Sequence, residues 1–108
     1  MNGDFPVVLA KYAGRIEAAS SPVEIKRLQR EAARKLLRST NVLRSEEDLL
    51  WPITLEDHAQ AFIERYPGME MPIQFFLNQA YDPTASSETY LTELRSMNQW
   101  MSQQIRKE

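Results

Sequence analysis

The chain has 108 residues, a formal net charge of −2, 43% hydrophobic and 26% charged residues, which is the composition of one ordinary globular domain. It contains no cysteine and a single histidine, His58, so disulfides, thiolate metal sites and a histidine-rich zinc site within one chain are excluded. No apolar run reaches the roughly 20 residues that span a bilayer, and the N-terminal stretch lacks the basic start of a signal peptide. We therefore expect one cytoplasmic domain over residues 1–108, without a cofactor and without membrane contact.

The first predicted helix begins at a cap on Asp4 and runs to about Ala18, because its apolar residues recur at helical spacing. Only the three residues 19–21 separate it from the next helical pattern. A connection this short favours an antiparallel return of the second helix.

The second predicted helix, SPVEIKRLQREAARKLLRSTNVL, has the clearest start in the chain. Ser21 is the expected N-cap, Pro22 takes the first helical position, and Glu24 completes a capping box. On this basis Ser21→Ala should destabilise the fold by about 1 kcal/mol. The apolar residues fall on one broad arc, and the opposite side carries the arginines at positions 27, 30, 34 and 38.

Three more helices are predicted, over residues 55–66, over 69–81, and from between Thr84 and Ser87 to about residue 105. Thr54 is a good N-cap with Asp57 three residues later, and the pairs Pro67-Gly68 and Asp82-Pro83 end the third and fourth helices. No useful segment alternates polar and apolar residues with a period of two. The predicted fold class is therefore all-α, a compact up-and-down bundle of about five helices.

Charge is distributed unevenly along the chain. The stretch 22–44 holds seven basic and two acidic residues, a net charge of +5, so the remainder carries −7 to give the total of −2. Two interpretations stay open: the basic side of the second helix binds a phosphate or an acidic partner, or it is a solvated face neutralised by acidic neighbours. The candidate ligand- or partner-binding residues on this helix are Arg27, Arg30, Arg34, Lys35 and Arg38.

Two further candidates lie outside this helix. His58, at the margin of the third helix's apolar stripe, is either a general base or a half-buried structural histidine, and the latter is favoured because no Ser, Cys or Asp accompanies it in a recognisable pattern. Trp51 is either a stacking surface for an aromatic ligand or an anchor in the core or an interface. Both are kept as candidate binding residues.

Catalytic motifs are missing from the sequence. Neither the GxxxxGK[ST] nor the GxGxxG phosphate loop occurs, and the chain has only three glycines. No nucleophile, base and oxyanion site can be assembled. HEPN-type ribonucleases place an arginine shortly before their histidine, whereas Arg44, the nearest arginine before His58, lies fourteen positions away. We do not expect the chain to be catalytic alone.

Three stretches together resemble a known family: KRLQREAARKLLRS, WPITLEDHAQAFIERYPGM and LNQAYDPTASSETYLTELRSMNQWMSQQI. Their order is similar to the C-terminal helical domain of bacterial nucleotidyltransferases of the polymerase-β type, a bundle related to kanamycin nucleotidyltransferase and to HEPN proteins. The family often has an arginine directly after the crossover threonine, where this chain has Leu55.

The resemblance implies a substrate-binding or docking module of a nucleotidyltransferase whose catalytic domain is not in this chain. Its expected partners are such a catalytic domain and nucleotide phosphates. The alternative is a small helical protein–protein interaction module, antitoxin-like or a self-associating scaffold, with no small-molecule ligand; whether the chain forms a homo-oligomer is left open.

Overall fold

A computed structural model describes residues 5–40 and 54–106. These residues form five α-helices, α1 (Phe5–Ala18), α2 (Pro22–Ser39), α3 (Leu55–Arg65), α4 (Glu70–Tyr81) and α5 (Ser87–Arg106), with a short 3-10 turn, η2 (Pro67–Met69), between α3 and α4. No strand occurs among them, which confirms the all-α prediction. No helix in this part of the chain is long and apolar enough to cross a membrane.

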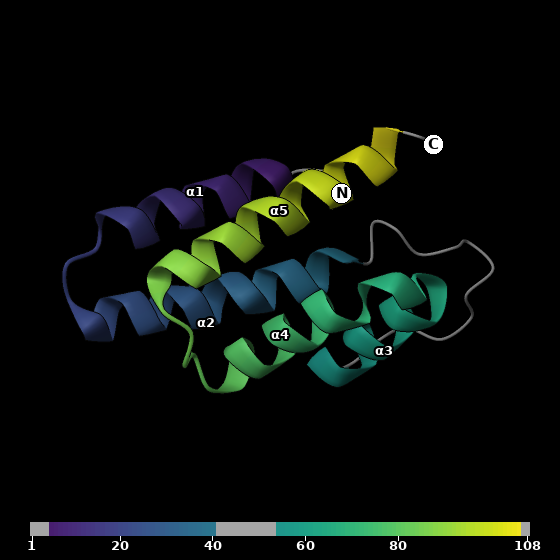
Figure 1. The fold of residues 1–108 in the computed structure, drawn as a ribbon, viewed down its shortest axis with the longest axis horizontal. Coiled ribbons are helices and arrows are strands. Elements are labelled where there is room, and N and C mark those ends of the chain that lie inside the picture. The colour runs from purple at the N-terminus through teal and green to yellow at the C-terminus, as the bar shows by residue number, and fades with distance from the viewer. Residues whose placement is uncertain (1–4, 41–53, 107–108) are drawn as a thin grey trace.

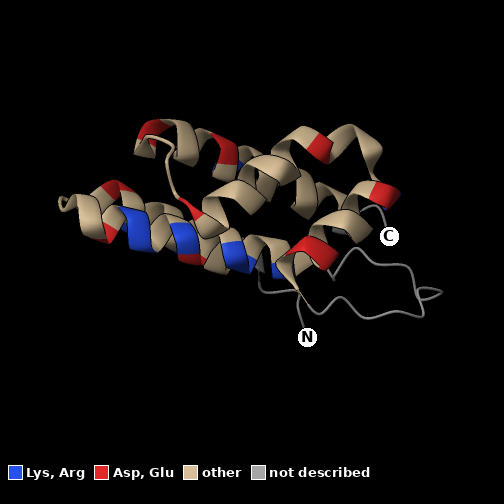
Figure 2. Ribbon diagram, turned by 90° about the horizontal axis from the view of Figure 1, so that it is seen from below, with Lys and Arg blue, Asp and Glu red and all other residues tan. Residues whose placement is uncertain are grey.

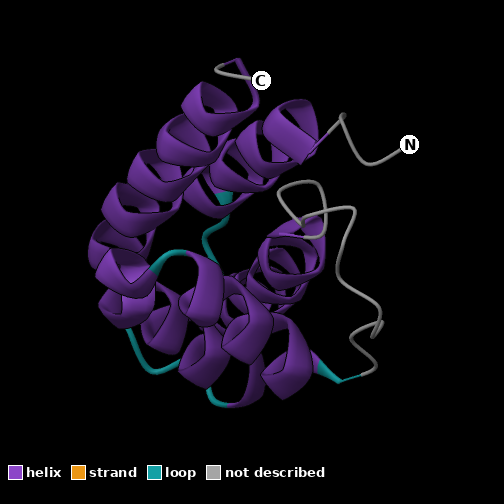
Figure 3. Ribbon diagram, turned by 90° about the vertical axis from the view of Figure 1, so that its right-hand side faces the viewer, coloured by secondary structure: helices purple, strands orange, loops and turns teal. Residues whose placement is uncertain are grey.

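The helices lie in two layers, α1 with α5 in one and α2, α4 and α3 in the other (Figures 1 and 3). α1 and α2 form the expected antiparallel hairpin, and α5 lies antiparallel to α1 although it is the last helix in the sequence. In space the order of neighbours is α3, α4, α2, α1, α5, and α5 also touches α2. α2 therefore contacts all four of the other helices.

The central position of α2 explains its composition. Its buried side is built largely from small and branched aliphatic residues, Leu28, Ala32, Ala33, Leu36 and Leu37, so neighbouring helices can approach closely. The buried residues of α4 and α5 complete the core, among them Ile73, Phe76, Ala80, Tyr90, Leu94 and Met101. At one edge of the bundle the rings of Phe62, Tyr66 and Trp100 contact one another and join α3 to α5.

The two predicted capping boxes have different outcomes. Thr54 caps α3 as predicted: its hydroxyl accepts a hydrogen bond from the Asp57 N–H at 3.0 Å, and the Asp57 carboxylate accepts one from the Thr54 N–H at 3.2 Å. The box at the start of α2 was predicted wrongly. Ser21 has the extended backbone of an N-cap, but its side chain makes no capping hydrogen bond, and the Glu24 carboxylate binds Arg27 instead.

Most boundaries agree with the sequence predictions. α1 ends at Ala18, α3 ends at Arg65 before the Pro67-Gly68 pair, and α4 ends at Tyr81 before Asp82. The expected cap at Asp4 and the predicted continuation of α2 past residue 40 lie outside the described residues. Ser86 precedes α5 and accepts a hydrogen bond from the Thr89 N–H at 3.2 Å, so it serves as the cap of that helix.

Candidate functional site

The basic side of α2 is the candidate site, and the fold keeps it on the outside. Since neighbouring helices cover the side with Leu28, Leu36 and Leu37, the opposite arc faces away from the core. Figure 2 shows its basic positions as a row of segments along α2. The predicted candidates on this helix are thus brought together on one face, which we call the basic face: Arg27, Arg30, Arg34, Lys35 and Arg38.

Arg27 is neutralised by residues of its own helix. Its guanidinium forms ion pairs with Glu24, one turn before it, and with Glu31, one turn after it at 2.7 Å. These hydrogen bonds, first to Glu24 and then to Glu31, raise the pKa of Arg27 above its ordinary value. Tyr12 of α1 also donates to Glu31, at 3.5 Å. Both acidic residues of α2 are therefore committed to Arg27, which has no free charge to offer a ligand.

The rest of the basic face has no such neutralisation. Within residues 5–40 and 54–106, no carboxylate forms an ion pair with Arg30, Arg34, Lys35 or Arg38. Three of them, Arg30, Arg34 and Lys35, are half-buried along their stems while Arg38 is exposed. The Nε of Arg34 is inaccessible to solvent and finds no hydrogen-bond partner among the described residues. Four cations are thus available on a surface already partly withdrawn from water.

Two exposed apolar side chains border the basic face. Val23 is 78% exposed one turn before Arg27 on α2. Tyr81, at the end of α4, is 53% exposed and donates a hydrogen bond to Glu56 at 2.8 Å. That bond raises the pKa of Tyr81 above its ordinary value, while the nearby charge of Arg34 acts in the opposite direction. The helical spacing of Val23 would have placed it on this face, but only the packing of α4 on α2 brings Tyr81 beside Arg34.

The other two candidates are not part of α2, and the structure describes only one of them, His58. His58 is buried in α3, with 7% of its surface exposed, which is more buried than the half-buried position expected from the sequence. Trp51 lies outside the described residues. Within those residues no group of three or more histidine, aspartate or glutamate side chains is arranged to hold a metal ion.

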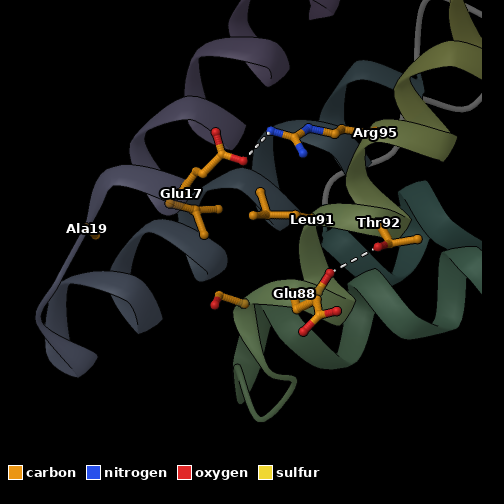
Figure 4. A pocket seen from close by; sticks show the side chains of 8 residues that line it. Glu17, Ala19, Glu88, Leu91, Thr92 and Arg95 are labelled. Atoms are coloured by element: carbon orange, nitrogen blue, oxygen red, sulfur yellow. Dashed lines mark hydrogen bonds and ion pairs between the residues drawn. The ribbon is translucent and has the colours of Figure 1, made fainter.

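A shallow hollow of about 320 Å³ lies between the end of α1 and the start of α5 (Figure 4). Leu91 lines its floor with Ile16, and its rim carries the ion pair between Glu17 and Arg95 at 3.3 Å. Glu17 and Arg95 compensate one another, which leaves Glu88 as the remaining charged residue of the lining, and the hollow contains no histidine or cysteine. The hollow offers a ligand less uncompensated charge than the basic face does.

Comparisons with known protein families, with curated proteins and with solved structures found no match to this chain. The described residues therefore support an all-α five-helix domain, and its role has to be argued from the basic face itself.

Proposed function

We propose that the chain is a helical docking module that binds an acidic protein surface through the four cations of the basic face that follow Arg27. The observation that carries this proposal is the division of charge on one helix. Arg27 uses both local carboxylates, whereas Arg30, Arg34, Lys35 and Arg38 have no ion-pair partner among the described residues. A cluster of cations is destabilising by mutual repulsion, and an acidic partner would relieve it.

The half-burial of these cations favours a protein over a small soluble anion. Arg30, Arg34 and Lys35 are each partly buried in the free protein. Part of the cost of removing them from water and of ordering their side chains therefore does not have to be met on association. The adjacent Tyr81 and Val23 add apolar area, and aromatic and arginine residues are enriched in protein interfaces. Two hollows lined by described residues, one between α1 and α5 and one between α1 and α2, are open to solvent, and neither encloses a nucleotide as an independent receptor would.

The resemblance noted in the sequence gives the partner a first candidate, the catalytic domain of a nucleotidyltransferase. In that arrangement the basic face docks on an acidic part of the catalytic domain or lines its nucleotide cleft. Guanidinium groups suit either role, because their planar fork binds carboxylates and phosphates through two parallel hydrogen bonds.

The test is titration of the purified chain with ATP and, separately, with the catalytic domain of a polymerase-β-type nucleotidyltransferase, at low and moderate salt. We expect weak or no binding of ATP and salt-sensitive docking to the domain, since exposed charges are screened over about 10 Å at 0.1 M salt. Arg30→Ala/Arg34→Ala should lose docking. Arg15→Ala/Arg95→Ala, which changes the net charge equally on exposed positions of α1 and α5, should keep it. Equal docking by both double variants would exclude the basic face.

A self-associating scaffold is the second candidate, and the observation that favours it is the exposure of Val7, Val23, Met71 and Tyr81. These four residues lie on α1, α2 and α4, and a second copy of the chain could cover any of these exposed apolar side chains. Analytical ultracentrifugation distinguishes the candidates. A dimer that forms as the concentration rises, and that Met71→Ser converts to monomer, supports self-association. A monomer at all concentrations supports docking to another protein.

A further inference from the structure

We propose that the partner presents an acidic helix to the basic face, with carboxylates at every fourth residue opposite Arg30, Arg34 and Arg38. This inference rests on the proposed docking function and deepens it, because it names the chemistry and the spacing of the surface that binds. Three observations carry it: the regular spacing of these arginines, the self-neutralised Arg27 at the end of the row, and the exposed ring of Tyr81 beside Arg34.

The spacing sets the geometry. At 1.5 Å rise per residue, arginines four positions apart are separated by about 6 Å along the axis of α2, and the three of them span about 12 Å. Glu or Asp residues at positions i, i+4 and i+8 of another helix have the same separation along its axis. They also have the same small rotation around the axis from one residue to the next. A helix laid along α2 therefore offers one carboxylate to each guanidinium, in the planar geometry that allows two hydrogen bonds per pair.

Arg27 fixes where the row of binding residues begins. It would extend the row by a further turn, but its ion pairs with Glu24 and Glu31 compensate it within α2. The Glu24 carboxylate would also repel an acidic partner that reached this turn. Glu31 follows Arg30 in the sequence, but its carboxylate is held by Arg27 and Tyr12. The contact is thus confined to the half of α2 that begins at Arg30.

The surroundings favour an acidic helix over a nucleic acid. A phosphate backbone also carries regularly spaced charges, but the whole chain has a net charge of −2, and nucleic-acid-binding domains are usually strongly basic. Tyr81, whose side chain is 53% exposed, lies beside Arg34 in the half of α2 where the contact is placed. The apolar residues that flank acidic positions on an amphipathic helix can pack against its ring.

Arg34 is the expected centre of the contact. It is the middle arginine of the row, its stem is half-buried, and its Nε has no hydrogen-bond partner among the residues described. A charged pair formed in a partly desolvated position at the centre of an interface contributes more to affinity than a pair at its rim. Arg30 and Arg38, one turn away on either side, are expected to contribute less.

The experiment uses three acidic probes with the intact chain at low salt. The first is a side-chain-stapled helical peptide with glutamates at i, i+4 and i+8. The second has the same composition with its glutamates redistributed around the helix, and the third is a single-stranded oligonucleotide. Titrations followed by fluorescence anisotropy are run with the wild type, with Arg34→Ala, and with Arg27→Ala/Glu31→Ala, which removes an ion pair without changing the net charge.

We expect the first peptide to bind at least about tenfold more tightly than the redistributed one. Arg34→Ala should lose that preference, and the Arg27→Ala/Glu31→Ala control should retain it. Arg34→Lys keeps the charge but not the planar fork, and it should bind the peptide with intermediate affinity. Circular dichroism on each variant confirms that the helices are intact.

The remaining outcomes separate this inference from the proposed function. Equal binding of both peptides, or an equal loss in the Arg27→Ala/Glu31→Ala control, would overturn the spacing argument while leaving an acidic docking partner in place. Tighter binding of the oligonucleotide would overturn the choice of a protein partner. If none of the acidic probes binds and the catalytic domain does not bind either, the proposed docking function itself is contradicted.

Discussion

At the scale of single residues, Tyr90 connects the aromatic part of the core to α2. Its ring is fully buried against Phe75 and Phe76. Its hydroxyl donates to the carbonyl oxygen of Gln29, in the middle of α2, at 2.6 Å. A buried hydroxyl needs a partner, and this one finds it on a helix 61 residues earlier in the chain.

Tyr90→Phe should destabilise the fold by about 1 kcal/mol, because it removes a buried hydrogen bond and leaves the ring packing in place. Urea denaturation followed by circular dichroism measures the change. Tyr66→Phe is a suitable control, since the Tyr66 hydroxyl is only a distant acceptor for Arg65 on the exposed side. An unchanged midpoint in Tyr90→Phe would show that water replaces the Gln29 contact without loss.

The same residue predicts a loss of stability in alkaline solution. Burial raises the pKa of Tyr90 above its ordinary value of 10.0, so the folded protein keeps a proton that the unfolded chain releases near that pH. Stability is then fully present below about pH 10 and falls as the pH rises further. Denaturation midpoints between pH 8 and pH 11 should show the advantage of the wild type over Tyr90→Phe shrinking. A constant difference between the two proteins would contradict this.

His58 is expected to have no catalytic role. It is buried in α3, and the sequence lacks the nearby preceding arginine that HEPN ribonucleases use. Purified protein should therefore cleave RNA no faster than buffer alone. Cleavage that disappears specifically in His58→Ala would restore the ribonuclease interpretation.

At the scale of helices, the ends of the elements are held by different means. α3 begins at a reciprocal capping box, whereas α2 begins at Pro22 with no side-chain cap. The connection from α4 to α5 is fixed by Gln79, whose buried side-chain oxygen accepts from the Ala85 N–H at 3.1 Å. The capping box and the Gln79 contact each provide a hydrogen-bond acceptor for a backbone N–H group that helical hydrogen bonds leave unpaired.

Thr54→Ala and Ser21→Ala form a matched pair of tests for these starts. Thr54→Ala removes the acceptor for the Asp57 N–H and should cost about 1 kcal/mol of stability. Ser21→Ala removes no hydrogen bond, so we now expect a change within about 0.5 kcal/mol. Chemical denaturation of both variants gives the comparison, and a larger effect at Ser21 than at Thr54 would mean that the cap of α2 forms in solution after all.

At the scale of the whole molecule, no strand forms among the described residues, and the two layers are held by helix packing and by side-chain hydrogen bonds such as the one from Tyr90 to Gln29. Far-UV circular dichroism should therefore give a mainly helical spectrum. A spectrum dominated by strand would contradict the architecture as a whole. The measurement is also the reference for every variant discussed above.

The sequence predicted the helices because their signals are local. Apolar spacing, Pro67-Gly68 and the Thr54–Asp57 pair each act within a few residues. The box at Ser21 was predicted wrongly for the same reason: Glu24 has two local partners, and the pattern does not say that Arg27 will be preferred. The row of arginines followed from helical periodicity, whereas the position of Tyr81 beside Arg34 depends on how α4 packs against α2.

The pairing of α1 with α5 has a consequence for synthesis of the protein. The ribosome releases α1 long before Ser87 and the rest of α5 exist, and at roughly 5–20 residues per second the delay is several seconds. During that interval α1 and α2 can form their hairpin, but the side of α1 that contains Leu9, Ala13 and Ile16 lacks its final cover. The nascent chain therefore carries an apolar strip that chaperones can bind until translation reaches the last helix.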